Sequence, residues 1–559
     1  MNRSILGQTL HIVCDMSILR RHWPLCIALT GALAFLSLIG VQILATTGGH
    51  LVYALDDPYI HLTLARNLAR YGTWGINPHE FASADSSLVW PLMLAVFIWL
   101  FGNSDIYPLL LNIILALVLI TVAYRLLDRH AVRGWLNLAC LTIGFFAAPI
   151  PALVYSGMEH VLQILAVLLF ADAVVDSIGN NAQARRSSWH IFFLAMLVTA
   201  TRYEGMFIVS VACVLLFVRR RFWLGIGVAL AASLPIALFG LISVLNGWYA
   251  LPSGLILKGF TPTDAGTSDS LGYFVKVANR AWQAILASPH LFWLATTGLF
   301  MLLLAIVRAH TGSIYVRFGW LLYIPTLLLH VAFASIGWFF RYEAYLVFWG
   351  IVLLALSLNS IRPTVRNTSK ALASCIVIIA GTLTTITFIF LAGRSLAAMR
   401  DTPLAAANIY EQQIQMSNWL KRYYAGQVVA INDIGAIGYR SGVTIVDLYG
   451  LASLDVIKLR QTRRYTPIEV EDLANSKNAA IAVIYDEWFT HGFLMNSLPT
   501  SWLRAGSWKI HNNVVAGSDT VSFYALRAEA LPGLVANLRA YASQLPADVE
   551  QTGLYMNGN

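Results

Sequence analysis

Two adjacent carboxylates, Asp56 and Asp57, follow the first long apolar run of this 559-residue chain. Like charges side by side repel each other, and this raises the pKa of at least one of the two carboxyl groups. Such a carboxylate suits a general base, and the pair could equally hold a divalent cation through hard oxygen ligands. Helix capping competes with both roles, because an aspartate before Pro58 is typical of a helix N-terminus. The residues alone leave function and capping open.

A second group of chemically capable residues lies inside or beside apolar runs: Glu159, Arg202, Glu204, Arg341 and Glu343. Ionisable groups at membrane depth are costly, so they usually pair with each other or face a polar cavity. Guanidinium groups are planar and permanently charged, which suits them to phosphate. Lys258, in an apolar loop, could bind a lipid phosphate as a point charge. Salt bridges between helices, or snorkelling in the case of Lys258, are the competing interpretations.

The composition predicts that membrane helices position these residues. The chain is 58% hydrophobic and 12% charged, whereas a soluble chain carries about 25% charged residues. Long apolar runs recur, so we expect a polytopic α-helical membrane protein with about eleven to thirteen spans. The run at 190–218 is interrupted by "TRYEG" and forms either one kinked helix or two short ones. The candidates are residues 24–46, 88–101, 107–126, 135–150, 160–178, 190–218, 222–245, 289–307, 315–336, 342–359 and 371–392.

Basic clusters between the apolar runs set the orientation. Cytoplasmic loops carry an excess of Lys and Arg, which places the loop 47–87 and the segment 393–559 outside. The segment 88–101 conflicts with this scheme unless it does not cross or another crossing is hidden. The clusters form no nucleic-acid patch, so we expect no nucleic-acid partner. They lie at residues 20–21, 125–133, 185–186, 219–221 and 362–370.

Two further segments have a recognisable pattern. Residues 60–74 carry an apolar stripe with Arg66 and Arg70 off it, which favours an amphipathic helix on the outer membrane surface over an ordinary loop helix. Residues 393–559 are polar, with short β-branched runs such as "QVVAIND", "VTIVDL" and "NAAIAVIYD" beside helical patterns. We therefore expect a membrane domain over 1–392 and an α/β domain outside the membrane over 393–559, ending in a helix and a frayed tail.

Several motifs resemble those of bacterial C-type (GT-C) membrane glycosyltransferases, in the order that family has them. The stretch "LDDPYIHLTLARNLARYGTWGINPHEFASADSSLVWPLML" resembles the family's first outer loop, which ends in a serine-rich element and a tryptophan, here Trp90. "YSGMEHVLQIL" is similar to its SGxE element, and "TRYEG" to TRPEG with Tyr203 in place of proline. "YALPSGLILK" is similar to LPNxxxxK, and "INDIGAIGYRSGVTIVDLYGL" resembles D-x-GAxGY…VxDxxGL. The arabinofuranosyltransferase-like branch is the most similar.

The resemblance implies a GT-C fold and an inverting hexosyl- or pentosyltransferase of the bacterial inner membrane, with its active site and C-terminal domain facing the periplasm. The donor would be a polyprenyl-phosphate-linked sugar, and the acceptor an envelope glycan, lipid or protein. No nucleotide cofactor is expected. Asp56 or Asp57 would be the catalytic base, with Asp56 favoured by its match to the family's leading acid. The substrate-binding residues would be His61, Trp90, Glu159, Arg202, Glu204, Lys258 and Arg341, of which Arg202, Lys258 and Arg341 would line the donor phosphate site.

Two other functions stay open: a transporter or flippase of a lipid-linked glycan, and a non-catalytic assembly subunit with the same fold. A transferase needs an acid at the outer surface, whereas a transporter needs its charges near the membrane midplane. The sequence contains no Walker A loop, no GxSxG and no HExxH motif. These absences argue against a P-loop nucleotide site and against two common hydrolase classes.

Overall fold

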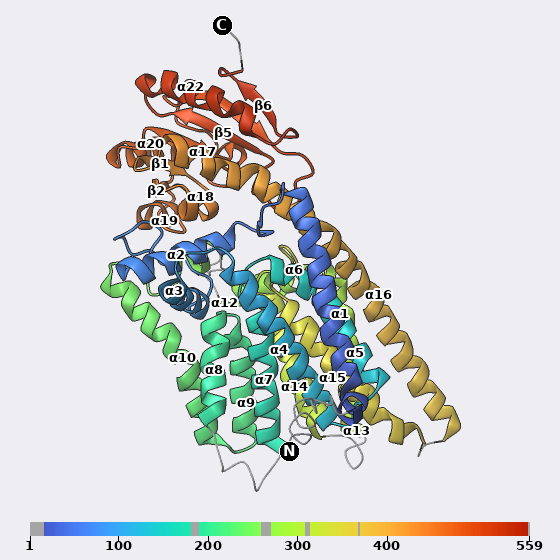
Figure 1. Ribbon diagram of the computed structural model, residues 1–559. Helices are drawn as coiled ribbons and strands as arrows, with labels where there is room; N and C mark the ends of the chain where they lie inside the picture. Colours follow the sequence, from blue (N-terminus) through green and yellow to red (C-terminus); the bar gives the residue numbers. More distant parts are fainter. Residues whose placement is uncertain (1–15, 180–188, 259–269, 308–313, 367–368, 557–559) are drawn as a thin grey trace, which may run out of the picture.

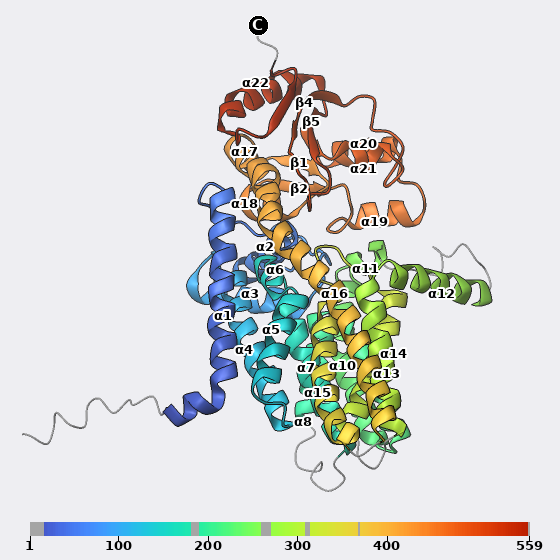
Figure 2. The same cartoon turned by 90° about the vertical axis from the view of Figure 1, so that its right-hand side faces the viewer.

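The computed structural model describes residues 16–179, 189–258, 270–307, 314–366 and 369–556. A bundle of helices carries an α/β domain at one end (Figures 1 and 2). Among the described residues, seven helices are long and apolar enough to cross a membrane. They are α1 (Met16–Thr46), α4 (Tyr107–Arg129), α7 (His160–Gly179), α10 (Phe222–Leu245), α13 (Pro289–Val307), α14 (Ile314–Phe333) and α16 (Lys370–Ile409).

Shorter apolar helices complete the bundle, so the predicted count of eleven to thirteen spans is reached only if they are included. The helical membrane class and the C-terminal α/β domain are confirmed. A helix of 13 residues is about 20 Å long, which is less than the hydrocarbon core of a bilayer. The short helices are α3 (Val89–Phe101), α5 (Trp135–Ala147), α8 (Trp189–Thr201), α9 (Gly205–Val218) and the apolar part of α15 (Ala344–Arg366).

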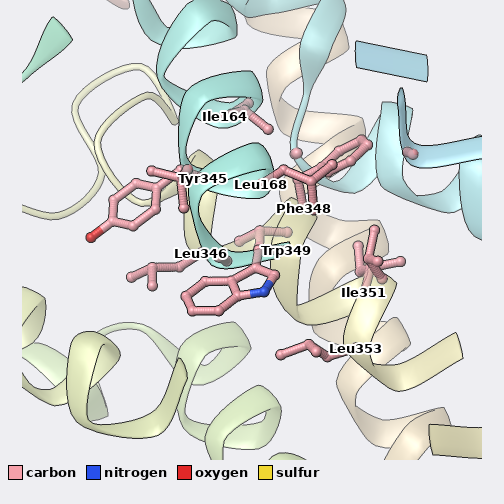
Figure 3. Close-up of a cluster of buried hydrophobic side chains, with 14 of the residues drawn as sticks. Ile164, Leu168, Tyr345, Leu346, Phe348, Trp349, Ile351 and Leu353 are labelled. Carbon is pink, nitrogen blue, oxygen red and sulfur yellow. The ribbon is translucent and has the colours of Figure 1, made fainter. Parts of the chain in front are cut away.

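Helix α15 forms the centre of the bundle. Its residues 344–357 are all buried, as expected for a helix that is apolar on every side. Figure 3 shows Tyr345, Phe348 and Trp349 of α15 in a cluster with Ile164 and Leu168 of α7. The interior around α15 is therefore packed with large side chains.

The structure answers two questions that the apolar pattern left open. Helix α3 has only 13 residues and packs against α2 (Asp57–Tyr71), near the α/β domain. Only α4 is then long enough to cross between Asp57 and the basic cluster at 125–133, which removes the conflict in orientation. The run at 190–218 forms two helices, α8 and α9, joined at "RYE".

Residues 60–74 were predicted to form a helix on the membrane surface; the helix is present, but the predicted environment is wrong. Helix α2 is amphipathic, but nine of its residues are buried, because α3 covers one side and α18 (Gly435–Arg440) of the α/β domain covers another. An amphipathic helix does extend from the bundle elsewhere. Figure 2 shows α12 (Ser270–Leu286) projecting sideways, and it exposes Val275, Trp282 and Leu286.

The α/β domain contains one six-stranded sheet in the order β2-β1-β3-β5-β4-β6. Strands β1, β2 and β3 are parallel and correspond to the three predicted runs, whereas the other pairs are antiparallel. Residues 550–553 are not frayed, because they form β6 and pair with β4 at the edge of the sheet. The last residues of the predicted tail, 557–559, lie outside the described residues. The strands are β1 (Val428–Ile431), β2 (Thr444–Asp447), β3 (Ile481–Ile484), β4 (Leu503–Lys509), β5 (Thr520–Ala525) and β6 (Glu550–Gly553).

Helices surround the sheet and connect it to the bundle. Helix α16 runs through residues 392–393 without a break and continues into the π-helical turn η1 (Tyr410–Ile414) and α17 (Gln415–Tyr423). The remaining helices are α6 (Ile150–Tyr155), α11 (Ser253–Lys258), α19 (Leu454–Gln461), α20 (Pro467–Ser476), α21 (Asp486–Thr490) and α22 (Leu531–Tyr541), with short 3-10 turns at Ala528–Ala530 and Ala542–Gln544.

Candidate active site

A cavity of about 350 Å³ lies where the bundle meets the α/β domain. Five segments far apart in the sequence form its wall: the start of α2, the loop after it, the α8–α9 link, α11 and the segment between α14 and α15. The α/β domain contributes Leu451. The charged and polar lining residues are Asp57, His61, Asp85, Ser86, Arg202, Tyr203, Glu204, Ser335, Arg341 and Tyr342.

Arg341 and Asp57 form an ion pair in this wall. One terminal nitrogen of Arg341 lies 2.6 Å from Oδ2 of Asp57, and the Arg341 side chain is 3% exposed. Its Nε and Nη1 groups have no hydrogen-bond partner among the described residues. The Asp57 side chain is 34% exposed and therefore reaches the cavity. Buried guanidinium donors normally find partners, so the two open groups of Arg341 mark a place for an acceptor-rich ligand.

Arg202 is held by two carboxylates. It donates to Glu159 at 2.7 Å and to Glu204 at 2.8 Å. The aromatic ring of Tyr342 faces both guanidinium groups, with its centre 5.3 Å from Arg202 and 5.0 Å from Arg341. Cation–π attraction of this kind fixes two like charges near each other. The cavity therefore has a cationic side formed by two arginines.

Glu159 and His61 support this cationic side from behind. Glu159 is fully buried and does not line the cavity, but it contacts Arg202 and accepts a hydrogen bond from Ser86 at 3.3 Å. His61 Nε2 lies 3.9 Å from Glu159 and 3.3 Å from Ser86. Burial lowers the pKa of His61, against the attraction of Glu159. The structure thus brings five of the predicted site residues together with Asp57: His61, Glu159, Arg202, Glu204 and Arg341.

Asp56 faces away from the cavity, toward the α/β domain. It is the N-cap residue of α2, but its side chain makes no cap hydrogen bond to α2. Its two oxygens accept instead from the backbone N–H groups of Gly435, at 2.8 Å, and Ala436, at 2.7 Å. Burial and the nearby Asp433 raise the pKa of Asp56, and the Ala436 N–H partly opposes that rise. The two adjacent aspartates therefore serve different partners.

Asp85 is a cavity residue that the sequence motifs did not single out. It is 2% exposed, and neither carboxylate oxygen has a hydrogen-bond partner in the part of the chain that the structure describes. Burial raises the pKa of Asp85 to about 7. A buried carboxyl group without hydrogen bonds is rare and is often found where a ligand binds.

The comparisons with known proteins found similarity at low identity. The family described as "Domain of unknown function (DUF8728)" matches residues 407–524, which lie in the C-terminal part. ArnT from Cupriavidus metallidurans, solved bound to undecaprenyl phosphate, is 14% identical over 90% of this chain and 99% of ArnT, with a TM-score of 0.46. The oligosaccharyltransferase from Archaeoglobus fulgidus is 12% identical over 91% of this chain and 75% of that one, with a TM-score of 0.46. No curated protein matches the sequence.

Besides Glu159, Trp90 is a predicted substrate-binding residue that does not line the cavity. Trp90 is fully buried in the packing between α2 and α3, and its indole N–H donates to the carbonyl of Gly157 at 3.1 Å. Lys258 is the last residue of α11, and its side chain lies outside the described residues. Helix α11 itself reaches the cavity through Gly254 and Leu255.

Other lining residues were not predicted, among them Tyr342 and Leu451. Tyr342 lies between two predicted charges, so its role between the arginines could have been suspected from the run "RYE". Leu451 comes from a domain that begins more than 300 residues after Asp57, and only the folded chain brings it to the cavity.

The carboxylate pair fits a divalent cation poorly. Asp56 is engaged by two backbone N–H groups, and Asp57 by the guanidinium group of Arg341. A cation needs several oxygen ligands that point at one place. Within the described ranges, no group of three or more His, Cys, Asp or Glu side chains could hold a metal ion.

Proposed function

We propose that the protein is a membrane glycosyltransferase that moves a sugar from a polyprenyl-phosphate donor to a hydroxyl acceptor, with inversion at the anomeric carbon. The observation that carries the proposal is Arg341, whose buried guanidinium group has two open N–H donors beside Asp57 in the cavity. A phosphate group presents several acceptor oxygens and suits such donors. The motif resemblance to GT-C glycosyltransferases supports the same assignment.

Arg341 and Arg202 would bind the donor phosphate. Negative charge grows on this phosphate as its bond to the sugar breaks, and preorganised cations stabilise that charge in the transition state. Glu159 and Glu204 keep Arg202 in place, and Tyr342 separates the two arginines. The cavity lies at the end of the bundle, where a lipid-linked donor could enter sideways from the bilayer.

Asp57 would be the base. The acceptor hydroxyl would give its proton to the Asp57 carboxylate while its oxygen bonds to the anomeric carbon. The bond between that carbon and the phosphate oxygen breaks, and the lipid phosphate leaves with the electron pair. Because Arg341 contacts Asp57, a phosphate on the open N–H groups of Arg341 would lie beside the carboxylate that receives the acceptor proton.

The acceptor would reach the cavity from the side of the α/β domain. A second cavity of about 410 Å³ lies there, between the α/β domain and the loops that carry Phe81 and Trp248. The two cavities are lined by consecutive residues, Leu451 on the first and Ala452 on the second. An envelope glycan, lipid or protein could extend along this path, with the active site on the periplasmic face of the inner membrane.

The first test measures binding of undecaprenyl phosphate to the purified protein by native mass spectrometry. Arg341→Gln removes hydrogen bonds to a charged group, each of which contributes about 1.5–3 kcal/mol, so affinity should fall roughly tenfold to a hundredfold. Arg129→Gln is the matched control, because Arg129 pairs with Asp172 and Asp176 at the far end of α4. Equal affinity of both variants and wild type would contradict the phosphate site.

The second test is genetic. Deleting the gene in its host should remove a sugar from the envelope glycans and cause the polyprenyl-linked sugar to accumulate. A copy with Asp57→Asn should fail to restore transfer, because loss of a general base costs about 10²–10⁴-fold in rate. The same variant should still bind undecaprenyl phosphate. Full restoration by Asp57→Asn, or unchanged glycans after deletion, would overturn the proposed function.

A further inference from the structure

Helix α18 is a six-residue helix of the α/β domain whose two ends are both bonded by side chains of the segment around α2. A helix this short has little stability of its own, and its terminal N–H and C=O groups need partners. It packs against α2, so it lies at the junction between the α/β domain and the segment that carries Asp57. The polar contacts at its ends show how tightly the two are joined.

Asp56 binds the N-terminal end. Its carboxylate oxygens accept from the N–H groups of Gly435 and Ala436, the first two residues of α18. Asp433, just before the helix, lies beside Asp56 and accepts from Tyr485 at 2.8 Å and from Gln413 at 3.1 Å. The acidic end of this contact is therefore fixed by several elements of the α/β domain.

Arg66 binds the other end. Its guanidinium group donates to the carbonyl of Tyr439 at 2.6 Å and to that of Gly438 at 3.1 Å. Both contacts satisfy terminal groups of α18, because oxygen atoms accept from N–H groups at its N-terminal end and a guanidinium group donates to carbonyls at its C-terminal end. Asp56 directly precedes α2, and Arg66 lies within it. The two side chains therefore bind both ends of α18 from one segment.

We propose that this clamp, formed by Asp56 and Arg66 of the α2 segment around α18, lets the α/β domain set the position of the Asp57 carboxylate. Asp57 is the first residue of α2 and follows Asp56 directly, so an Asp56 carboxylate held by two hydrogen bonds restricts the backbone that carries Asp57. Asp56 is then a positioning residue. The inference rests on the proposed function because it takes Asp57 as the base, whereas the contacts of the clamp do not depend on that function.

Gly435 offers a sharp way to disturb the clamp. A methyl group there would overlap both the carboxylate and the carbonyl oxygen of Asp56, so Gly435→Ala must push the two segments apart. Gly438→Ala is the matched control on the same helix, because its methyl group would meet no atom nearer than 3.4 Å. Asp56→Ala and Arg66→Gln remove the two side chains of the clamp without adding volume.

The experiment has three readouts on the full-length protein: hydrogen–deuterium exchange of peptides covering residues 51–60 and 432–441, affinity for undecaprenyl phosphate, and restoration of envelope glycans in the deletion host. Gly435→Ala and Asp56→Ala should speed exchange in both peptides and keep lipid-phosphate binding. Their transfer should fall by about 10²-fold, the effect of misplacing a reacting group by roughly 1 Å. Arg66→Gln should speed exchange at residues 432–441, and Gly438→Ala should behave as wild type.

The outcomes separate the clamp from the proposed function. Wild-type exchange and transfer in Gly435→Ala and Asp56→Ala would overturn the clamp while leaving the transferase intact. Faster exchange with unchanged transfer would show that the contact exists but does not position the base, and it would also overturn the inference. If the variants exchange faster but the wild-type protein itself transfers no sugar, the proposed function is contradicted and the contact is not.

Discussion

At the scale of single residues, the adjacent aspartates show how neighbours in sequence acquire separate tasks. Asp57 starts α2 and turns to Arg341 and the cavity, whereas Asp56 turns to the amides of α18. Successive residues at a helix start point about 100° apart, so two neighbours seldom face one ligand. We therefore place the base at Asp57, whereas the match to the family's leading acid favoured Asp56.

Asp85 leads to a prediction at the same scale. Burial raises its pKa from 3.8 to about 7, so between these values the folded protein holds a proton that the unfolded chain has released. The free energy of unfolding should then fall as pH rises through this window. Asp85→Asn cannot ionise, so the difference between its Tm and that of wild type should move in favour of the variant as pH rises from about 4 to about 7.

Thermal unfolding of both proteins in detergent at several pH values checks this expectation. Asp455→Asn, at an exposed carboxyl group, serves as the control. If the Tm values of wild type and Asp85→Asn change equally with pH, Asp85 stays ionised in the folded protein. The pH dependence would then have to be assigned to another group.

At the scale of elements, α3 supports the site from behind. The turn at Ser156–Gly157 brings Glu159 toward Arg202, and Gly157 has a φ of +69°, which favours glycine. A side chain at Gly157 would also crowd Tyr53 and Pro58. The indole of Trp90 holds this turn by donating to the Gly157 carbonyl. The serine-rich element and its tryptophan therefore shape the site through packing.

Trp90→Phe tests that role. The substitution leaves a buried carbonyl without its donor, which should lower stability by about 1–3 kcal/mol. Affinity for undecaprenyl phosphate should stay as in wild type at temperatures where the protein is folded. Trp99→Phe on the same helix is the control, because Trp99 is 73% exposed. A loss of lipid affinity with an unchanged Tm would instead place Trp90 in contact with substrate.

At the scale of the whole molecule, the bundle and the α/β domain share one junction. Asp56 and Arg66 contact α18, Asn77 exchanges two hydrogen bonds with Ile445 of the edge strand β2, and Arg440 pairs with Asp105. The loop 47–87 and the α/β domain thus lie at the same end of the bundle (Figure 1). The basic residues at the C-terminal end of α4 and the arginines that follow α9 lie toward the other end.

Cysteine labelling in intact cells checks the orientation. In a background without native cysteines, an impermeant maleimide should label Ser476→Cys, which is exposed in the α/β domain. It should not label Arg133→Cys, which is exposed at the far end of α4, until the cells are opened. The reverse pattern would invert the predicted topology and place the cavity on the cytoplasmic side.

The sequence by itself determined the class of protein and most of the polar residues that meet at the site. Apolar runs of helical length and three β-branched runs are local signals, and they became the bundle and strands β1, β2 and β3. Charged residues inside apolar runs were expected to lie near each other, since burying an unpaired charge is costly. Arg202, Glu204 and Arg341 do line one cavity.

Only the tertiary structure decided which face each of these elements presents. The stripe on α2 predicted a membrane surface, but the polar side of α2 is matched by α18 from almost 380 residues away, a partner that no local pattern reveals. Trp90 could have faced a substrate or the core, and packing between α2 and α3 chose the core. Asp56 and Asp57 have the same chemistry and adjacent positions, so contacts between distant segments alone assign one to the α/β domain and the other to the cavity.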